Sequence, residues 1–442
     1  MGHYPLIMVG AGPANLAVLI YLKEGLGFSV EDHCVVLESE QQIRWHPGLC
    51  TSQATLQISM LKDLVCLRDP TSHFTFINFL NERGVLSQYV HLDTFHPSRE
   101  LYGQYLSWVA EHFASIIRYG RKVTRISQLC DGDDLTFCVR TEPHRGIEET
   151  YNCQRLLLAV GRKPYVPPEA DIDHFRVFHS GELLPRTESA HFPPDGTYVV
   201  LGAGQSAGEV ARYLLGRSRR ARVHVISKGY LFRQIDDNPF VNDLYSDTSA
   251  RQFFGLAEKV HRRRLSELMN TNYGVVDSTA IRDLYRLAFD RKVSGQGGLT
   301  LHSYSKLDRV EPLDTLLRVV IADLDGDSNE SVEDVSAVVC ATGYQNSRLR
   351  DLVGDLLPKA DGCAKATELD EFFEVKLERG RGLFALNHGH STHGLTEGTM
   401  TGLAHRAQRI GDRLELAVMA SAQVAVGQRE SIFREAQSGR RI

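Results

Sequence analysis

The sequence predicts an α/β fold with two Rossmann-type dinucleotide-binding domains and a small, mainly helical substrate region. The order strand, glycine turn, helix occurs twice and carries this prediction. In the first copy, apolar residues 6–9 lead into GAGPAN at 10–15, and apolar residues continue at helical spacing over 16–22. In the second copy, apolar residues 198–201 lead into GAGQSAG at 202–208. This order is typical of nucleotide-binding units, so two copies indicate two nucleotide sites.

Composition and charge exclude several other classes of protein. The 442 residues are 42% hydrophobic and 24% charged, which is the balance of a globular chain with a sizeable core. A formal net charge of −5 argues against a nucleic acid or an anionic membrane surface as partner. The eight cysteines are scattered without a CxxC pair, so we expect reduced thiols in a cytoplasmic protein. No stretch reads as a targeting signal or a membrane helix.

The first glycine turn fits an adenine dinucleotide. Gly10 permits the tight turn, and Gly12 lets the backbone approach the pyrophosphate at the N-terminus of the next helix. Glu38, at the end of the second strand, can accept hydrogen bonds from ribose hydroxyls. Asn15 stands where the third glycine of GxGxxG is usual. Because of the acid at the ribose position, the first site suits FAD.

The second glycine turn has the opposite ribose chemistry. Gly202, Gly204 and Ala207 form a GxGxxA pattern, and the following strand ends at Ser227 and Lys228 with no acidic residue. An acid at that position would repel a 2′-phosphate, whereas serine and lysine would bind it. The second nucleotide is therefore NADPH rather than NADH. The two turns together predict a flavoprotein that takes hydride from NADPH.

Shifts in composition suggest how the domains are arranged along the chain. We expect residues 1–190 to form the first part of the FAD-binding domain. Residues 191–345 would form the NADPH-binding domain, with a helical substrate insertion at about 236–290. Residues 346–442 would return to the FAD-binding domain and end in a long helix from 401 to about 436.

Two classes of flavoprotein fit the sequence poorly. A disulfide reductase needs a cysteine pair near the first helix, and the chain has none. Flavin monooxygenases that oxygenate carbon or sulfur usually carry an FxGxxxHxxx(W/F) linker, whereas this linker reads VFHSG at 177–181. The histidines at 388, 390 and 393 lack acidic or cysteine partners at ligand spacing, so we expect no metal.

Several long runs identify a family. The chain resembles the N-hydroxylating flavin monooxygenases, and most of all the L-ornithine N-monooxygenases of siderophore biosynthesis. The likeness covers nearly the whole chain and includes RWH at 44–46, LQISMLKDLV at 56–65, RDPTS at 68–72, DNPFVN at 237–242, NTNY at 270–273 and HGL at 393–395. It implies FAD, NADPH and O₂ as reactants, and oxygen transfer from a flavin hydroperoxide to a side-chain amine.

The resemblance also implies roles for individual residues. Lys62 and Asn242 match the residues that hold the carboxylate and α-amino group of the substrate, and a cation at Lys62 would repel a diamine. Asn272 and Gln57 match residues beside the flavin and the reacting amine, where we expect catalytic contacts. Thr401 keeps the hydroxyl of a substrate-binding serine.

The glycine turns and the resemblance together predict the cofactor-binding residues. Of these, the residues up to number 46 belong to the flavin site, and those from 202 to 228 belong to the NADPH site. The full set is Gly10, Gly12, Pro13, Asn15, Glu38, Trp45, His46, Gly202, Gly204, Gln205, Ser206, Ser227, Lys228, Thr342, Gly343 and Leu395.

One departure from the family pattern bears on the substrate. After HGL the ornithine enzymes usually continue SDTLLS, whereas this chain reads TEGTMT at 396–401, which changes the shape of the wall. Ornithine is the expected substrate, and lysine, putrescine and cadaverine remain alternatives. An uncoupled NADPH oxidase and a flavin monooxygenase of another class also stay open. The sequence also leaves open whether the protein forms a homo-oligomer.

Overall fold

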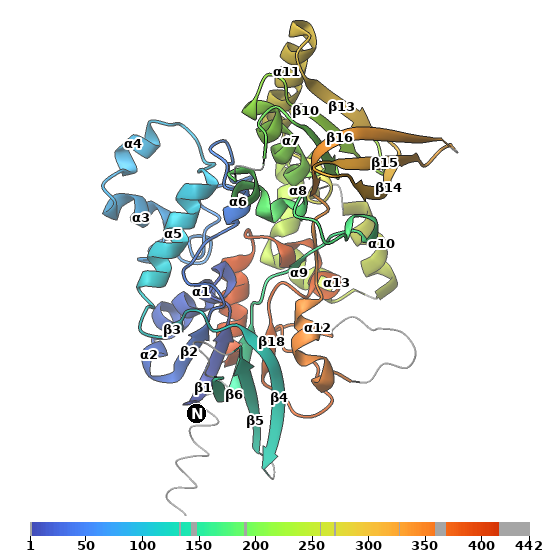
Figure 1. The fold of residues 1–442 in the computed structure, drawn as a ribbon. Helices are drawn as coiled ribbons and strands as arrows, with labels where there is room; N and C mark the ends of the chain where they lie inside the picture. The colour runs from blue at the N-terminus through green and yellow to red at the C-terminus, as the bar shows by residue number, and fades with distance from the viewer. Residues whose placement is uncertain are drawn as a thin grey trace, which may run out of the picture.

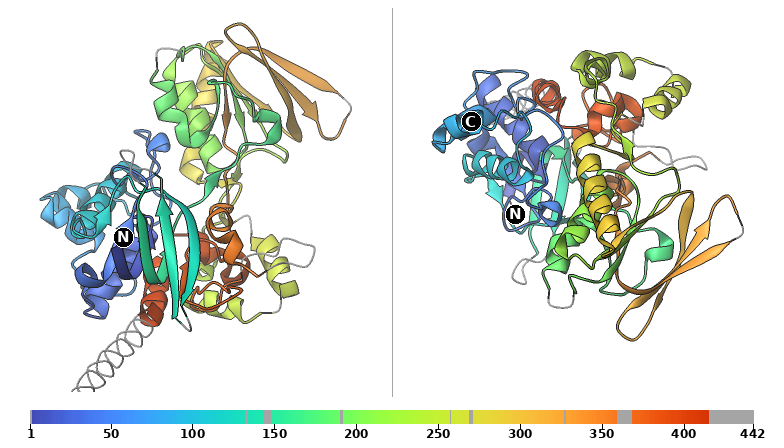
Figure 2. Two further views of the ribbon diagram at one scale, coloured as in Figure 1. Left: turned by 60° about the horizontal axis from the view of Figure 1, so that its bottom comes forward. Right: turned by 90° about the horizontal axis from the view of Figure 1, so that it is seen from above.

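The computed structural model describes residues 2–131, 134–142, 148–189, 192–256, 258–268, 271–326, 328–358 and 368–414. Within these residues the chain forms two seven-stranded sheets that lie apart from each other, each with its own helices (Figure 1; Figure 2). This arrangement confirms the predicted α/β fold with two Rossmann-type units. None of the helices in the described part of the chain has the length and apolar character needed to span a bilayer.

The first sheet is built around β1. Its strand order is β3-β2-β1-β6-β5-β4, with β18 paired to β6. Strands β1, β2, β3, β6 and β18 run parallel, and β4, β5 and β6 form an antiparallel meander. The bounds are β1 Gly2–Val9, β2 Cys34–Leu37, β3 Ile117–Arg118, β4 Val123–Asp131, β5 Asp134–Thr141, β6 Thr150–Leu158 and β18 Leu383–Ala385.

The second sheet repeats this plan. Its order is β13-β10-β9-β16-β15-β14, with β8 paired to β16. Strand β9 takes the place of β1, β10 that of β2, β13 that of β3, and β16 that of β6. The bounds are β8 Val177–His179, β9 Thr197–Leu201, β10 Arg222–Ile226, β13 Gly298–His302, β14 Ser305–Pro312, β15 Leu317–Asp323 and β16 Asn329–Cys340.

Each sheet receives one strand from outside its own run of sequence. Strand β16 outlasts its antiparallel partner β15, whose pairing ends at Val335, so residues 338–340 of β16 can pair with β8. Strand β8 precedes residue 191, and the chain therefore enters the second sheet before the boundary suggested by composition. In the first sheet β18 pairs with the end of β6 in the same way, at residues 156–158.

Helices connect and cover the strands. Helix α1 follows the first glycine turn, α7 follows the second, and α8 to α10 fall in the segment expected to be a helical insertion. The bounds of the helices are α1 Pro13–Ile20, α2 Val30–His33, α3 Phe76–Glu82, α4 Leu86–Val90, α5 Arg99–Glu111, α6 Leu183–Thr187, α7 Gln205–Arg217, α8 Pro239–Asn242, α9 Asp247–Phe254, α10 Glu258–Leu268, α11 Ser278–Ser294, α12 Arg348–Val353 and α13 His390–His393.

The remaining elements are short. A π-helical turn, Tyr21–Gly25, extends α1, and a 3₁₀ turn, Gly394–Gly398, follows α13. Strands β11 (Arg233–Gln234) and β12 (Val275–Val276) pair with each other, and β7 (Lys163–Pro164) pairs with β17 (Tyr344–Gln345). Residues 403–414 are helical and largely buried, and the rest of the expected C-terminal helix lies outside the described residues.

Apolar burial explains why the glycine turns are held firmly. Every residue from Leu6 to Val9 is buried, as is every residue of α1 after Pro13. A strand buried on both faces reads as a continuous apolar run, which is the pattern seen in the sequence. The second unit has its own core, in which Val200, Val210 and Val339 are fully buried. The two turns are therefore anchored in two separate cores.

Candidate active site

The two glycine turns have the same backbone geometry. Gly10 has φ +91°, and a Cβ added there would lie 2.5 Å from the carbonyl oxygen of Ala159. Gly202 has φ +116°, and a Cβ there would lie 2.4 Å from the carbonyl oxygen of Ala341. In both cases a side chain would collide with the backbone of the residue that directly follows the neighbouring parallel strand, β6 or β16. These cradles fit the close backbone approach that a dinucleotide pyrophosphate needs.

Asn15 accounts for the missing third glycine in the first turn. Its side chain is fully buried, and Nδ2 donates hydrogen bonds to the carbonyl oxygens of Val9, at 3.0 Å, and Gly10, at 2.6 Å. The amide therefore ties α1 to the end of β1 and holds the turn. Its Oδ1 has no hydrogen-bond partner among the described residues. In the second turn the corresponding residue is Ala207, which is also buried.

Glu38 lies where a ribose is expected. Its Oε2 accepts a hydrogen bond from the backbone N–H of Ala11 at 2.6 Å, and its Oε1 accepts one from Glu40 at 2.9 Å. A cavity of about 660 Å³ opens beside it and is lined by residues 9, 10, 12, 37–40, 121–123, 159–161, 348, 351 and 352. The cavity and the glycine cradle together fit the adenosine end of FAD.

A neighbouring cavity of about 430 Å³ continues from the same turn. Gly12 and Pro13 line it on one side, and Trp45, His46 and Arg162 line other parts of it. Gly12 is the N-terminal cap of α1 and has open space beside it. The helix N-terminus thus faces free volume, which fits a diphosphate leading toward the ring of a flavin.

Gln205 is held in one orientation at the second turn. Its Nε2 donates to Asp277 Oδ2 at 2.7 Å and to Glu209 Oε1 at 3.0 Å, and its Oε1 accepts from the backbone N–H of Asp277 at 2.9 Å. Glu209 in turn forms a bidentate ion pair with Arg99 from α5, with N···O distances of 3.0 and 2.9 Å. This network joins the two units directly beside the cleft.

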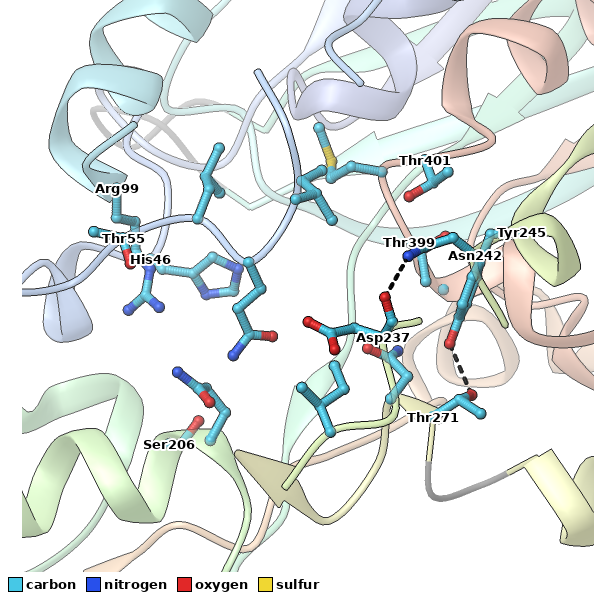
Figure 3. A pocket seen from close by; sticks show the side chains of 18 of the residues that line it. His46, Thr55, Arg99, Ser206, Asp237, Asn242, Tyr245, Thr271, Thr399 and Thr401 are labelled. Atoms are coloured by element: carbon cyan, nitrogen blue, oxygen red, sulfur yellow. Dashed lines mark hydrogen bonds between the residues drawn. The ribbon is translucent and has the colours of Figure 1, made fainter. Parts of the chain in front are cut away.

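A cleft of about 300 Å³ collects most of the predicted catalytic and substrate residues. Figure 3 shows Thr401 and Asn242 on one side of it, with His46 and Ser206 across from them. Its lining includes the predicted residues Trp45, His46, Gln57, Gln205, Ser206, Asn242, Asn272 and Thr401. These residues come from both units and from the helical segment between them.

Lys62 reaches the cleft through Asn242. Lys62 Nζ donates a hydrogen bond to Asn242 Oδ1 at 3.2 Å, across 180 residues of sequence. The Nδ2 of Asn242 donates to the carbonyl oxygen of Asp237 at 2.8 Å, so the amide is oriented at both ends (Figure 3). Lys62 has no acidic partner among the described residues, and burial lowers the pKa of its ammonium group. A cation in this setting attracts a carboxylate.

The wall formed by residues 396–401 is braced from behind. Glu397 and Arg406 are both buried and form an ion pair at 3.3 Å. The Arg406 guanidinium also donates to the carbonyl oxygens of Thr396 and Thr399, and Glu397 Oε1 accepts from the backbone N–H of His388 at 3.1 Å. Burial raises the pKa of Glu397, whereas the nearby guanidinium lowers it. The pair fixes the backbone that presents Thr401.

Gly398 shapes the same wall. A Cβ at Gly398 would lie 2.7 Å from Arg162 Nη2 and 2.8 Å from Tyr273 Oη. The absence of a side chain thus lets an arginine and a tyrosine approach the wall.

Some predicted residues lie away from the cleft. The side chain of Leu395 is buried and lines a separate cavity with Phe253 and His393. Thr342 and Gly343 form the turn after β16, where the Thr342 hydroxyl donates to the carbonyl oxygen of Tyr165. Ser227 and Lys228 directly follow β10 and are not among the residues that line the cleft.

The histidines near residue 390 are packing residues in this structure. Burial lowers the pKa of His388 to about 4 and that of His393 to about 3, so both are neutral at physiological pH. The His393 ring stacks on Phe373, with ring centroids 4.1 Å apart. Over the described ranges, no group of three His, Cys, Asp or Glu side chains is arranged to hold a metal ion.

Sequence reasoning missed several residues that the structure places at the cleft. Arg99, Asp237 and Tyr245 line it, and Glu209 and Asp277 orient residues that do. Asp237 begins the run DNPFVN at 237–242, and Arg99 ends FHPSR at 95–99, which also resembles the family, so the resemblance was the available signal. Glu209 and Asp277 had no local signal, because their partners are 110 and 72 residues away.

Comparisons with known proteins agree with this geometry. The sequence profile of the family described as L-lysine 6-monooxygenase/L-ornithine 5-monooxygenase matches residues 2–346. An L-ornithine N(5)-oxygenase from Arthrobotrys oligospora is 31% identical over 95% of this chain and 89% of its own length. An L-ornithine N(5)-monooxygenase from Pseudomonas aeruginosa is 31% identical over 93% of each chain.

Solved structures agree as well. The ornithine N-hydroxylase from Kutzneria sp. 744, described with reduced FAD, NADP⁺ and L-ornithine, has a TM-score of 0.86 and 26% identity. The match covers 94% of this chain and 99% of that one. The ornithine hydroxylase from Pseudomonas aeruginosa has a TM-score of 0.84 and 28% identity, over 93% and 98% of the two chains. This chain therefore belongs to the L-lysine 6-monooxygenase/L-ornithine 5-monooxygenase family.

Proposed function

We propose that this protein is an FAD- and NADPH-dependent monooxygenase that uses O₂ to N-hydroxylate the side-chain amine of L-ornithine. The product would be a hydroxylamine for a siderophore or another hydroxamate natural product. The family membership supports the reaction class, and the related ornithine enzymes support the substrate. The first sheet and its glycine turn would hold FAD, and the second sheet and its turn would hold NADPH.

The hydrogen bond between Lys62 and Asn242 is the observation that favours an amino acid over a diamine as the substrate. This hydrogen bond holds the Lys62 ammonium group next to Asn242, at the end of the cleft that Thr401 also lines. The ammonium group has no acidic partner among the described residues. A carboxylate would neutralise this charge, whereas the second ammonium of putrescine or cadaverine would be repelled by it. Asp237, which lines the same cleft, offers an acceptor for the α-ammonium group of an amino acid.

The opposite end of the substrate would reach the flavin side of the cleft. FAD reduced by NADPH supplies the oxygen-activating chemistry there. Gln57 and Asn272 line this space, and an amide can both donate and accept hydrogen bonds, so each can steady the amine or the nicotinamide. A free alkylammonium group has a pKa near ~10.4, so the site must favour the neutral amine by desolvating it.

The free thiols support a reducing compartment. Six of the cysteines lie in the part of the chain whose side chains are described, and all six are unpaired. We therefore propose the cytoplasm as the location. Besides FAD and NADPH, the proposed reaction requires O₂ and a small amine.

The decisive experiment follows NADPH consumption and hydroxylamine formation together in purified, FAD-loaded protein. Ornithine, lysine, putrescine and cadaverine would be compared at equal concentrations. We expect hydroxylamine in proportion to NADPH consumed with ornithine, and little with the diamines. Coupled product from another amine would keep the reaction class and overturn the substrate. NADPH oxidation without hydroxylamine for every amine would overturn the monooxygenase assignment.

A further inference from the structure

The residues that follow β2 in the first sheet correspond one by one to those that follow β10 in the second sheet. The backbone N–H of Glu38 donates to the carbonyl oxygen of Arg118 at 3.0 Å, and that of Ser227 donates to His302 at 3.0 Å. Ser227 therefore takes the place of Glu38, and His302 that of Arg118. Because the strand orders are the same, the loops that follow these residues can be compared directly.

This correspondence extends to Tyr304. The N–H of Gly120 donates to the carbonyl oxygen of Glu40 at 2.9 Å, and the N–H of Tyr304 donates to that of Gly229 at 3.2 Å. Glu40 and Gly229 each lie two residues after Glu38 and Ser227. Tyr304 thus occupies in the second unit the position that Gly120 occupies in the first.

The backbone at this position is left-handed in both units. Gly120 has φ +66°, which costs glycine nothing, whereas Tyr304 has φ +50°. A bulky residue in this region is strained, and such strain persists where a function requires the side chain. The ring of Tyr304 does not enter a core, because the residue is 45% exposed. Packing within the described chain therefore does not account for the tyrosine.

The neighbours of Tyr304 make an open aromatic surface beside a positive charge. Tyr230 is 67% exposed, and its ring centroid lies 6.4 Å from that of Tyr304. Lys228 is exposed and has no ion pair among the described residues. In the first unit the residues matching Ser227, Lys228 and Gly229 are Glu38, Ser39 and Glu40, so two carboxylates are exchanged for one ammonium group.

The first unit indicates what occupies such a place. Its residues 38–40, which match 227–229, and Arg121, which matches Ser305, line the cavity of about 660 Å³ that fits the adenosine end of FAD. By the same geometry, the loops at 227–230 and 303–305 flank the adenosine end of the second nucleotide. Figure 1 shows β10, β13 and β14, which carry these loops, together in the second unit.

We propose that Tyr304, with Tyr230, is the platform on which the adenine of NADPH stacks, next to the 2′-phosphate held by Ser227 and Lys228. The adenine is a flat aromatic surface that stacks on a tyrosine ring, and the phosphate neutralises the free ammonium of Lys228. The strained backbone of Tyr304 aims its ring outward, toward the nucleotide. This inference rests on the proposed use of NADPH but not on the identity of the amine.

The test measures binding of 2′,5′-ADP to the FAD-loaded full-length protein by calorimetry. Replacing Tyr304→Gly installs the residue found at the matching position of the first unit, and Tyr304→Asn keeps a side chain that tolerates a positive φ. Both should raise the Kd about tenfold or more, since both remove the stacking ring. Tyr304→Phe keeps the ring and should stay within about twofold of the unmodified protein.

Two further measurements distinguish a failure of the proposed adenine platform from a failure of the proposed use of NADPH. FAD content and melting temperature should be unchanged or higher for Tyr304→Gly, because the substitution relieves a strained backbone. AMP in place of 2′,5′-ADP should lose the contribution of Lys228 but keep the effect of Tyr304→Gly. Equal Kd values for Tyr304→Gly and the unmodified protein would overturn the platform alone. No binding of 2′,5′-ADP by the unmodified protein would overturn the use of NADPH as well.

Discussion

At the scale of single residues, the proposed selection of ornithine depends most on Lys62. We expect Lys62→Ala to raise the KM for ornithine by about ten- to a hundredfold, since a hydrogen bond to a charged group contributes about 1.5–3 kcal/mol. NADPH oxidation should continue, because Lys62 does not contact either glycine turn. Steady-state kinetics of both reactions would check this. Lys23→Ala removes an exposed ion pair with Glu31 and serves as a control with unchanged KM. An unchanged KM in Lys62→Ala would point to a diamine substrate.

The protonation of Lys62 leads to a pH effect on KM. Burial lowers its pKa below the ordinary value near 10.5, so the ammonium charge is lost at a lower pH than in an exposed lysine. The KM for ornithine should therefore rise on the alkaline side. Lys62→Arg should flatten this rise, because the guanidinium stays protonated. If the KM of the unmodified protein and that of Lys62→Arg rise in parallel with pH, another group, such as the substrate amine, is responsible.

At the scale of elements, Asp277 joins the N-terminus of α11 to the second glycine turn. Its Oδ1 accepts from the backbone N–H of Ala280 at 2.8 Å, and its Oδ2 holds Gln205. Asp277→Ala should cost about 1 kcal/mol of stability through loss of the cap. It should also raise the KM for NADPH, because Gln205 loses one of its three orienting hydrogen bonds. Asp277→Asn keeps a capping oxygen, and its melting temperature should stay near that of the unmodified protein. Thermal unfolding and NADPH kinetics separate the two roles.

At the scale of the whole molecule, the Arg99–Glu209 ion pair connects the two units. The side chains are 12% and 3% exposed, so removing the guanidinium leaves a buried carboxylate without its cation. Arg99→Ala should destabilise the protein by about 3–5 kcal/mol. Glu209→Gln in the same chain should recover part of this loss, because no buried charge remains. Denaturant unfolding of both variants measures the difference. Equal loss in the single and double variants would show that packing, rather than charge, explains the effect.

For the whole molecule, the sequence predicted part of the fold and part of the candidate site. Both glycine turns could be read from the chain because strand, turn and helix are contiguous in sequence and each follows from local periodicity. Asn15 was visible only as a departure from GxGxxG, and its two hydrogen bonds to the end of β1 explain why that departure is tolerated. Strand β8 could not be assigned to the second sheet, because its pairing depends on the length of β16, more than 150 residues later.

By itself, the sequence determined the α/β class, the two nucleotide units and the family, because those rest on short runs whose chemistry is complete within a few residues. Only the tertiary structure decided that Lys62 meets Asn242, that Arg406 braces the wall ending at Thr401, and that Arg99 pairs with Glu209. The first pair is 180 residues apart in sequence and the third is 110 residues apart. Arg406 is only 7 residues from Thr399, but the two residues lie on different elements. They form because burial in shared cores brings separate elements together, and no local pattern records that packing.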